Sequence, residues 1–137
     1  MTAVPLVRDA MLTEPRSLAS DASAQEAGII LSRVEVRSVL VVDRAGSLLG
    51  EVTRERLVER VVAAGIAAAE VAVGEIAVPV ELALDAGLDL DAAFKLMEEH
   101  DAERLPVIDG GRLVGALSRS VLQLRLAEDE PPPAPEL

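Results

Sequence analysis

The sequence contains no cysteine, tryptophan or tyrosine, and it has one histidine and one phenylalanine. Without cysteine the chain can form neither disulfide bonds nor thiolate metal sites. Without tryptophan and tyrosine it lacks the aromatic platforms on which single-stranded nucleic acids stack. His100 has no second imidazole with which to build a metal site or a catalytic triad. We therefore expect no metal, no disulfide and no enzymatic activity of this chain on its own.

Positive charge is also scarce, because 13 lysine and arginine residues stand against 24 aspartate and glutamate residues, for a net charge of −11. Binding to DNA or RNA needs a basic surface, so the charge excludes a general affinity for nucleic acids. Long uncharged apolar runs are absent, and the N-terminal stretch MTAVPLVRDAM lacks the apolar core of a signal peptide. We expect a soluble cytoplasmic protein that binds neither nucleic acid nor membrane.

What the sequence does contain is an internal repeat with a spacing of about 66 residues. An apolar run that ends in aspartate, Val39–Asp43, is followed by a glycine-containing apolar segment over 46–53. The same order returns in Leu105–Asp109 and in 111–118. A repeated unit of this kind usually cannot bury its apolar face alone and needs its neighbour. We therefore expect two similar halves with a functional cleft between them.

Hydrophobic spacing predicts the same succession of elements in both halves, with helices on a 3.6-residue period and short β-branched strands. The predicted elements are a helix over 24–34, strands over 39–42 and 48–53, a helix over 54–64, a helix over 89–99, strands over 105–108 and 113–117, and a helix over 120–127. On the two helices of the first half, the side chains expected to face inward are Ala27, Ile30, Leu31, Val34, Leu57, Val58, Val61 and Val62. The predicted domains are a first unit over 5–65, a second over 70–126, and a disordered, acidic and proline-rich tail over 127–137.

The order and spacing of several short motifs resemble those of the cystathionine-β-synthase (CBS) domain. In the first half they are Val7–Met11, Ser20-Asp21, Glu26-Ala27, Val41–Asp43, Gly46 and Gly50–Thr53; in the second they are Glu98–Asp109, Leu113–Gly115 and Ser118. The resemblance implies an α/β (α+β) fold of two pseudo-symmetric CBS units, a Bateman module. Each unit would be a small sheet with two helices, and the two sheets would pack face to face. It also implies a homodimer and a regulatory ligand such as AMP, ATP or S-adenosylmethionine.

Family members carry Gly-x-x-Thr/Ser-x-x-Asp at the end of the second hairpin strand, and the aspartate accepts hydrogen bonds from ribose hydroxyls. This sequence keeps the hydroxyl residues as Thr53 and Ser118, but Arg56 and Val121 stand at the aspartate positions. The two hydroxyl residues can help a helix start to hold a phosphate, or they can simply cap the helix. The sequence therefore departs from the ribose-binding pattern in both halves.

The resemblance also assigns candidate contacts to a ligand. Arg104 is placed where family members often contact phosphate, and Arg54, Arg56 and Arg119 could add forked donors. Arg54 and Arg119 could equally pair with surface glutamates. Leu105 and Pro106 could line the site, although such side chains also serve as ordinary core.

Two functions follow. The first is a stand-alone regulatory module that senses a small anionic ligand, of the adenine-nucleotide class, in the cleft between the units and signals to an unidentified partner protein. The alternative is a degenerate, ligand-free CBS pair that serves as a scaffold for dimerisation or protein interaction, which the missing aspartates favour. A third hypothesis is an enzyme whose catalytic groups come from a second chain.

Overall fold

The computed structural model describes residues 4–129, and the chain folds as a mixed α+β protein with two small β-sheets. This confirms the predicted fold class. The chain divides into two compact units. The first-repeat unit comprises Arg16–Glu81 and Gly110–Leu113, and the second-repeat unit comprises Leu82–Asp109 with the described parts of Met1–Pro15 and Val114–Leu137.

The N-terminal segment packs in the second-repeat unit, whereas the sequence boundaries place it within 5–65. Those boundaries, together with 70–126, describe the repeat along the sequence rather than compact packing, and they stay a prediction. Of the tail predicted over 127–137, helix α6 (Arg119–Asp129) covers 127–129, and 130–137 lie outside the described residues.

The sheet of the first-repeat unit has the strand order β2-β3-β4. These strands are Ser17–Ala19, Ser38–Val42 and Leu48–Thr53, respectively. β2 runs parallel to β3, and β3 runs antiparallel to β4. In the turn between β3 and β4, Oδ1 of Asp43 accepts hydrogen bonds from the backbone N–H groups of Ala45 and Ser47, both at 2.9 Å. The predicted hairpin is confirmed, and its aspartate stabilises the turn locally.

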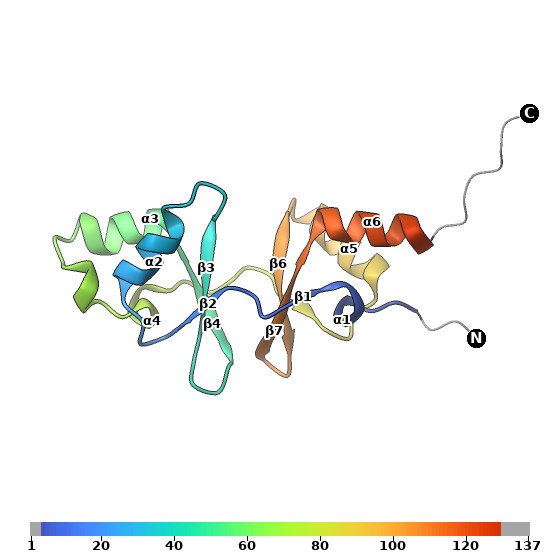
Figure 1. Cartoon of the computed structure of the whole chain (residues 1–137), viewed down its shortest axis with the longest axis horizontal. Helices are drawn as coiled ribbons and strands as arrows, with labels where there is room; N and C mark the ends of the chain where they lie inside the picture. Colours follow the sequence, from blue (N-terminus) through green and yellow to red (C-terminus); the bar gives the residue numbers. More distant parts are fainter. Residues whose placement is uncertain (1–3, 130–137) are drawn as a thin grey trace, which may run out of the picture. The chain divides into compact units, whose positions relative to one another are not determined.

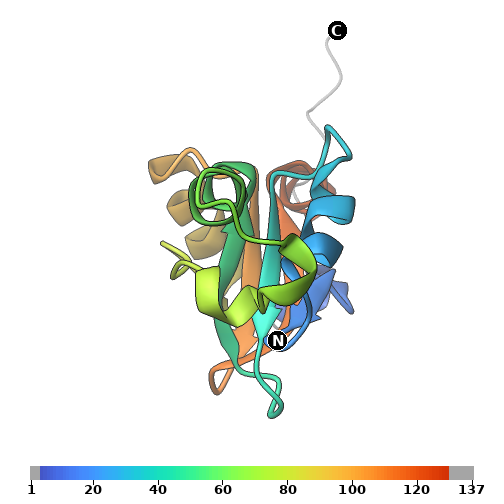
Figure 2. The same ribbon diagram turned by 90° about the vertical axis from the view of Figure 1, so that its left-hand side faces the viewer.

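Helical segments cover one face of this sheet, and Figure 2 shows the unit from its helical side. They are α2 (Ala24–Leu31), α3 (Arg54–Leu57), a π-helical continuation (Val58–Val62), a 3₁₀ turn (Ala68–Glu70) and α4 (Val73–Ile76). A capping box starts α2: Ser23 Oγ accepts from the Glu26 N–H at 3.2 Å, and Glu26 Oε2 accepts from the Ser23 N–H at 2.9 Å. The sequence therefore fixes where α2 begins.

The predicted end of α2 is wrong. The helix stops at Leu31 instead of residue 34, and Val34 is 90% exposed rather than buried. Ser32 Oγ donates a hydrogen bond to the Ile29 carbonyl at 2.6 Å. Such local side-chain bonds compete with helix continuation, and β-branched Val34 adds little helical propensity.

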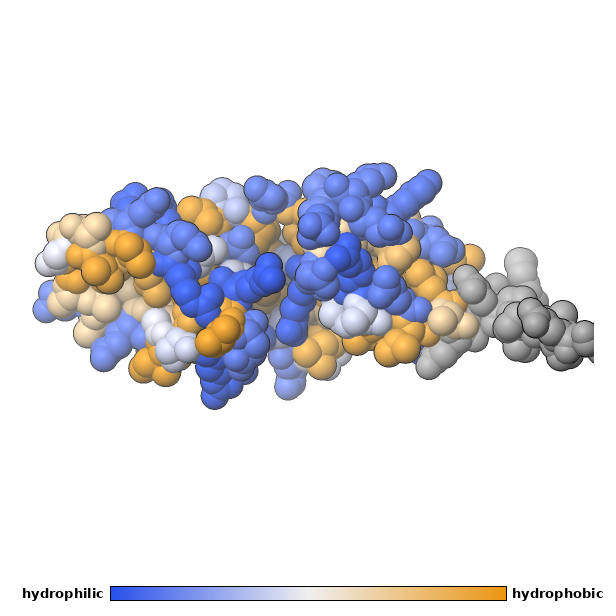
Figure 3. Space-filling model, turned by 90° about the horizontal axis from the view of Figure 1, so that it is seen from above, coloured by the Kyte–Doolittle hydropathy of each residue, from blue (hydrophilic) through white to orange (hydrophobic). Residues whose placement is uncertain are grey.

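Two inward-facing predictions for the next helix are also wrong. Val58 is 55% exposed and Val62 is 71% exposed, whereas Val61 is buried. Val58–Val62 is π-helical, with wider turns than an α-helix, so Val58 and Val61 do not share a face as residues three apart in an α-helix would, and Val62 turns away from its buried neighbour. Figure 3 shows the resulting apolar surface at the helical end of the first-repeat unit.

The sheet of the second-repeat unit has the strand order β1-β7-β6-β5. The strands are Leu12–Thr13, Arg112–Ser118, Arg104–Asp109 and Leu84–Asp85, in that order across the sheet. β1 is antiparallel to β7, and β5 is parallel to β6. α5 (Leu90–Glu99) and α6 lie over one face, and α1 (Val7–Ala10) precedes β1 (Figure 1). Asp89 Oδ1 caps α5 by accepting from the Ala92 N–H at 2.8 Å.

In each sheet, a segment from a distant part of the chain pairs with an outer strand, next to a glycine of that strand. β1 pairs with β7, and Val78 exchanges backbone hydrogen bonds of 2.8 and 2.9 Å with Glu51 in β4. A Cβ atom on Gly50 would collide with the Val78 carbonyl oxygen, and one on Gly115 would lie 2.8 Å from the Leu12 carbonyl oxygen. Both glycines therefore permit the close backbone approach of a neighbouring segment.

The two cores differ in the size of their side chains. The first is built mainly from valine and alanine, namely Ala24, Ala27, Leu31, Val39, Val41, Val52, Val61, Val71, Val73 and Ile76. The second is richer in leucine and methionine, namely Val7, Leu84, Ala86, Leu90, Ala93, Met97, Leu105, Val107, Leu117 and Leu122. Within residues 4–129, no helix has the length and hydropathy needed to cross a membrane.

Candidate functional site

Helix α6 begins where strand β7 ends, and Ser118 joins the two elements. Ser118 Oγ accepts a hydrogen bond from the backbone N–H of Val121 at 3.2 Å, which caps the helix. The first turn of a helix carries unpaired N–H groups and the positive end of the helix dipole, so it favours negative charge. The plain capping alternative is therefore observed at Ser118, and the helix start itself is suited to an anion.

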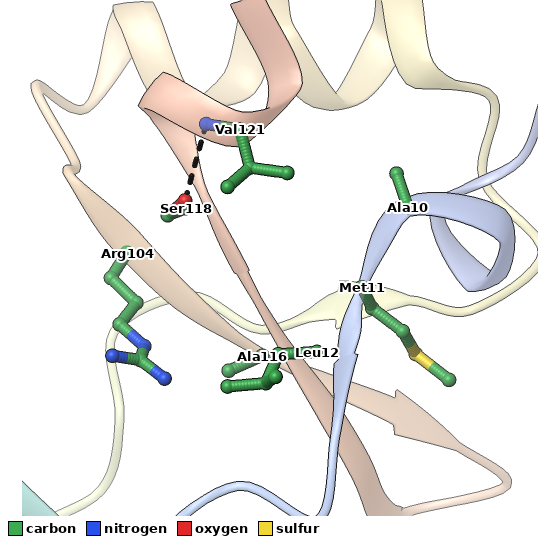
Figure 4. A pocket seen from close by; sticks show the side chains of 7 residues that line it. All are labelled: Ala10, Met11, Leu12, Arg104, Ala116, Ser118 and Val121. Carbon is green, nitrogen blue, oxygen red and sulfur yellow. Dashed lines mark hydrogen bonds between the residues drawn. The ribbon is translucent and has the colours of Figure 1, made fainter. Parts of the chain in front are cut away.

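A pocket of about 310 Å³ opens beside this helix start (Figure 4). It is formed entirely within the second-repeat unit. The lining residues are Ala10, Met11, Leu12, Arg104, Ala116, Ser118 and Val121. In Figure 4, Arg104 and Met11 stand on opposite sides of the pocket, with Val121 above and Ala116 below. Side chains from the N-terminal segment, β6, β7 and α6 therefore converge on one space.

The chemistry of this pocket combines one cation with an apolar wall. Arg104 is exposed at the beginning of β6, and its planar guanidinium offers a fork of N–H donors that matches phosphate or carboxylate. Five of the seven lining side chains are apolar. The structure thus brings together two predicted site residues, Arg104 and Ser118, in a setting that suits a small anion with an apolar body.

Arg119 lies at the same helix start but is engaged elsewhere. Its guanidinium forms ion pairs with Glu103 and, at 3.5 Å, with Asp101, and its side chain is 20% exposed. It is not among the residues that line the pocket. The alternative of pairing with a surface glutamate is the arrangement that the structure shows.

Leu105 and Pro106 follow Arg104 in β6, and both are buried. Leu105 belongs to the core of the second-repeat unit. Neither residue lines the pocket, so in this structure they support the strand that carries Arg104.

The other three predicted site residues belong to the first-repeat unit and make contacts within it. Thr53 caps α3, because its Oγ1 accepts from the Arg56 N–H at 3.2 Å. Arg56 donates through Nε to the Ile76 carbonyl at 2.7 Å. Arg54 donates through Nη2 to the Arg33 carbonyl at 2.6 Å. Both arginines therefore hold backbone carbonyls near the ends of neighbouring helices.

Sequence reasoning did not identify the lining residues from the N-terminal segment, which include Met11 and Leu12. The available signal was Gly115, since a glycine inside a strand often marks the close approach of another backbone. In the structure, Met11 Sδ would lie 2.6 Å from a Cβ atom at Gly115. Among residues 4–129, no three histidine, aspartate or glutamate side chains gather in a way that could hold a metal ion.

The comparisons with known proteins agree with this architecture. The family model described as the CBS domain matches residues 7–63 and 73–126. The chain is 27% identical over 110 residues to an inosine-5'-monophosphate dehydrogenase of Nitrosopumilus maritimus (strain SCM1), covering 80% of this chain and 22% of that protein. It is 27% identical over 124 residues to the CBS domain-containing protein YhcV of Bacillus subtilis (strain 168), covering 90% of this chain and 87% of that protein. The chain therefore spans about a fifth of the dehydrogenase and nearly all of YhcV.

Solved structures share the fold at low sequence identity. A structure of a putative acetoin utilization protein (AcuB) from Vibrio cholerae has a TM-score of 0.76, 24% identity, and coverage of 95% of this chain and 100% of that chain. CBSX2 in complex with AMP has a TM-score of 0.70, 23% identity, and coverage of 92% and 99%. The CBS domain pair of protein MJ0100, in complex with 5′-methylthioadenosine and S-adenosyl-L-methionine, has a TM-score of 0.63, 21% identity, and coverage of 93% and 100%.

Proposed function

The chain belongs to the CBS domain family, and on that premise we propose that it is a regulatory module that binds a small anionic ligand of the adenine-nucleotide class. AMP is the first candidate, and ATP and S-adenosylmethionine are the others. Related folds that carry AMP or S-adenosylmethionine support this class. The single observation that carries the proposal is the pocket in which Arg104 and Ser118 meet an apolar wall at the start of α6.

Each part of this pocket matches one part of the proposed ligand. The phosphate would lie between the guanidinium of Arg104 and the exposed N–H groups of the α6 start. The purine would lie against aliphatic side chains such as Leu12 and Ala116, because the lining contains no aromatic residue. A pocket of about 310 Å³ is at the small end of the range for ligand sites, which favours a nucleoside monophosphate over larger ligands.

Binding would act as a signal by shifting an equilibrium between conformations of the module. A ligand can shift such an equilibrium only by its difference in affinity for the two states. The pocket draws on the N-terminal segment, on β6 and on α6, so a bound ligand ties together segments that are far apart in the sequence. A partner protein that recognises one state would then sense the ligand.

Calorimetric titration with AMP, ATP and S-adenosylmethionine tests the proposal. We expect measurable heat with AMP, and a stabilisation of about 2.7 kcal/mol when the ligand is present at one hundred times its dissociation constant. R104A should weaken AMP binding by at least about tenfold, because a charged hydrogen-bond donor is lost. R60A is the matched control, since Arg60 is exposed in the first-repeat unit and should leave the affinity unchanged. No heat and no thermal stabilisation with any of the three ligands would refute the proposal.

The alternative is a ligand-free scaffold, which one observation favours. The position at which the family pattern has its ribose-binding aspartate holds Val121 in this unit, and its counterpart Arg56 is hydrogen-bonded to the Ile76 carbonyl. For a scaffold, R104A would change neither thermal stability in AMP nor the oligomeric state. The same titration therefore separates the two functions.

The remaining parts of the proposal concern assembly and location. We propose that the chain catalyses no reaction by itself, forms a homodimer, regulates a partner protein, and works in the cytoplasm, where adenine nucleotides are made and used. Val58 and Val62 are exposed and supply apolar surface suited to a second copy. A molar mass from light scattering that corresponds to the monomer would contradict the homodimer.

A further inference from the structure

The pocket beside α6 has an uneven supply of polar groups. Among its seven lining side chains, Arg104 can only donate hydrogen bonds, and no carboxylate is present. The remaining polar side chain is Ser118, whose Oγ already accepts from the Val121 N–H at 3.2 Å. The lining can therefore recognise an anion, but it offers little to a hydroxyl group that needs an acceptor.

Val121 is the residue that leaves the pocket short of hydrogen-bond acceptors. It occupies the first turn of α6, and its side chain projects into the pocket (Figure 4). A carboxylate at this place could accept hydrogen bonds from two neighbouring hydroxyl groups at once, whereas valine offers only apolar contact. The hydroxyl groups of a bound sugar would then lose hydrogen bonds to water without gaining a charged acceptor.

We infer that Val121 is a specificity-determining residue that makes the pocket indifferent to the ribose hydroxyls of its ligand. This inference rests on the proposed function. The pocket selects for an anionic group and an apolar ring, and it accepts nucleotides with and without a 2′,3′-diol equally well. A ligand of this chain is thus defined by its phosphate and its base rather than by its sugar.

The test compares AMP with 2′,3′-dideoxyadenosine monophosphate by calorimetry on the full chain. For the wild type we expect dissociation constants that agree within about threefold. For V121D we expect a preference of at least about tenfold for AMP, because a carboxylate gains hydrogen bonds from the diol. V121A is the matched control and should bind the two nucleotides with similar affinity. Val121 is 47% exposed, and an acidic residue in the first turn of a helix is favourable, so V121D should keep its fold and its circular dichroism spectrum.

The outcomes separate this inference from the function on which it rests. A wild type that binds AMP more than tenfold tighter than the dideoxy analogue refutes the inference and leaves nucleotide binding intact. A V121D protein that folds but gains no preference refutes the assignment to Val121. If the wild type binds neither nucleotide, the proposed function fails and the inference fails with it.

Discussion

The starts of helices α3 and α6 hold equivalent places in the two repeats but use their side chains differently. Thr53 and Ser118 cap the two helices in the same way, each with a hydrogen bond of 3.2 Å. Three residues later, Arg56 donates to the Ile76 carbonyl, whereas Val121 lines a pocket. The two helix starts are thus capped alike, but the residue three positions later bonds to its own unit in one repeat and lines a pocket in the other.

The largest expected loss of stability comes from shortening a buried side chain in either core. Leu117 in β7 and Val52 in β4 are equivalent in the repeat, and both are fully buried. L117A should lower the free energy of unfolding by about 2–5 kcal/mol. V52A should cost less, because it removes two carbon atoms rather than three. Chemical denaturation measures both, and a larger loss for V52A would contradict the difference between the cores.

Replacing the strand glycines Gly50 and Gly115 should give the next largest loss of stability. A methyl group at Gly50 would meet the Val78 carbonyl oxygen, which cannot move without breaking the edge pairing with Glu51. At Gly115 the methyl group would meet the Sδ of Met11 at 2.6 Å, which can move aside, and the Leu12 carbonyl oxygen at 2.8 Å, a less severe backbone clash than the one at Gly50. We expect G50A to destabilise the protein by about 1–3 kcal/mol and G115A by less. Equal melting temperatures for G50A and the wild type would contradict this account of the edge.

The smallest effect concerns the arginine that distinguishes the two helix starts. R56V places a valine at the start of α3, as the start of α6 has at the equivalent position 121. It also removes a hydrogen bond of 2.7 Å to the Ile76 carbonyl. The free energy of unfolding should fall by about 0.5–1.5 kcal/mol. R60V, at an exposed position on the following helical turn, controls for the helical propensity of valine. If both variants lose the same stability, Arg56 does not hold α4 in place.

The strands were predictable because short β-branched runs next to aspartate and glycine leave few alternatives. The sequence placed β4 over its observed residues 48–53, and it placed the other hairpin strands to within one residue at each end. The end of α2 and the exposure of Val58 and Val62 were not predictable in the same way. They depend on local bonds such as that of Ser32 and on the π-helical turn over Val58–Val62.

The candidate site was predictable only in part. The resemblance named Arg104 and Ser118, and the structure places both around one pocket. It could not show that Arg56 is bonded to Ile76 or that Arg119 is paired with Glu103, because both contacts join residues that are far apart in the sequence. The wall contributed by Met11 and Leu12 depends on the pairing of β1 with β7, whose register no local pattern encodes.

Crystals grown with AMP provide the most direct test of the difference between the repeats. The account predicts density for the phosphate between Arg104 and the start of α6, with the base against Leu12 and Ala116. Density at the start of α3 beside Arg56, with the Arg104 pocket unfilled, would contradict the account.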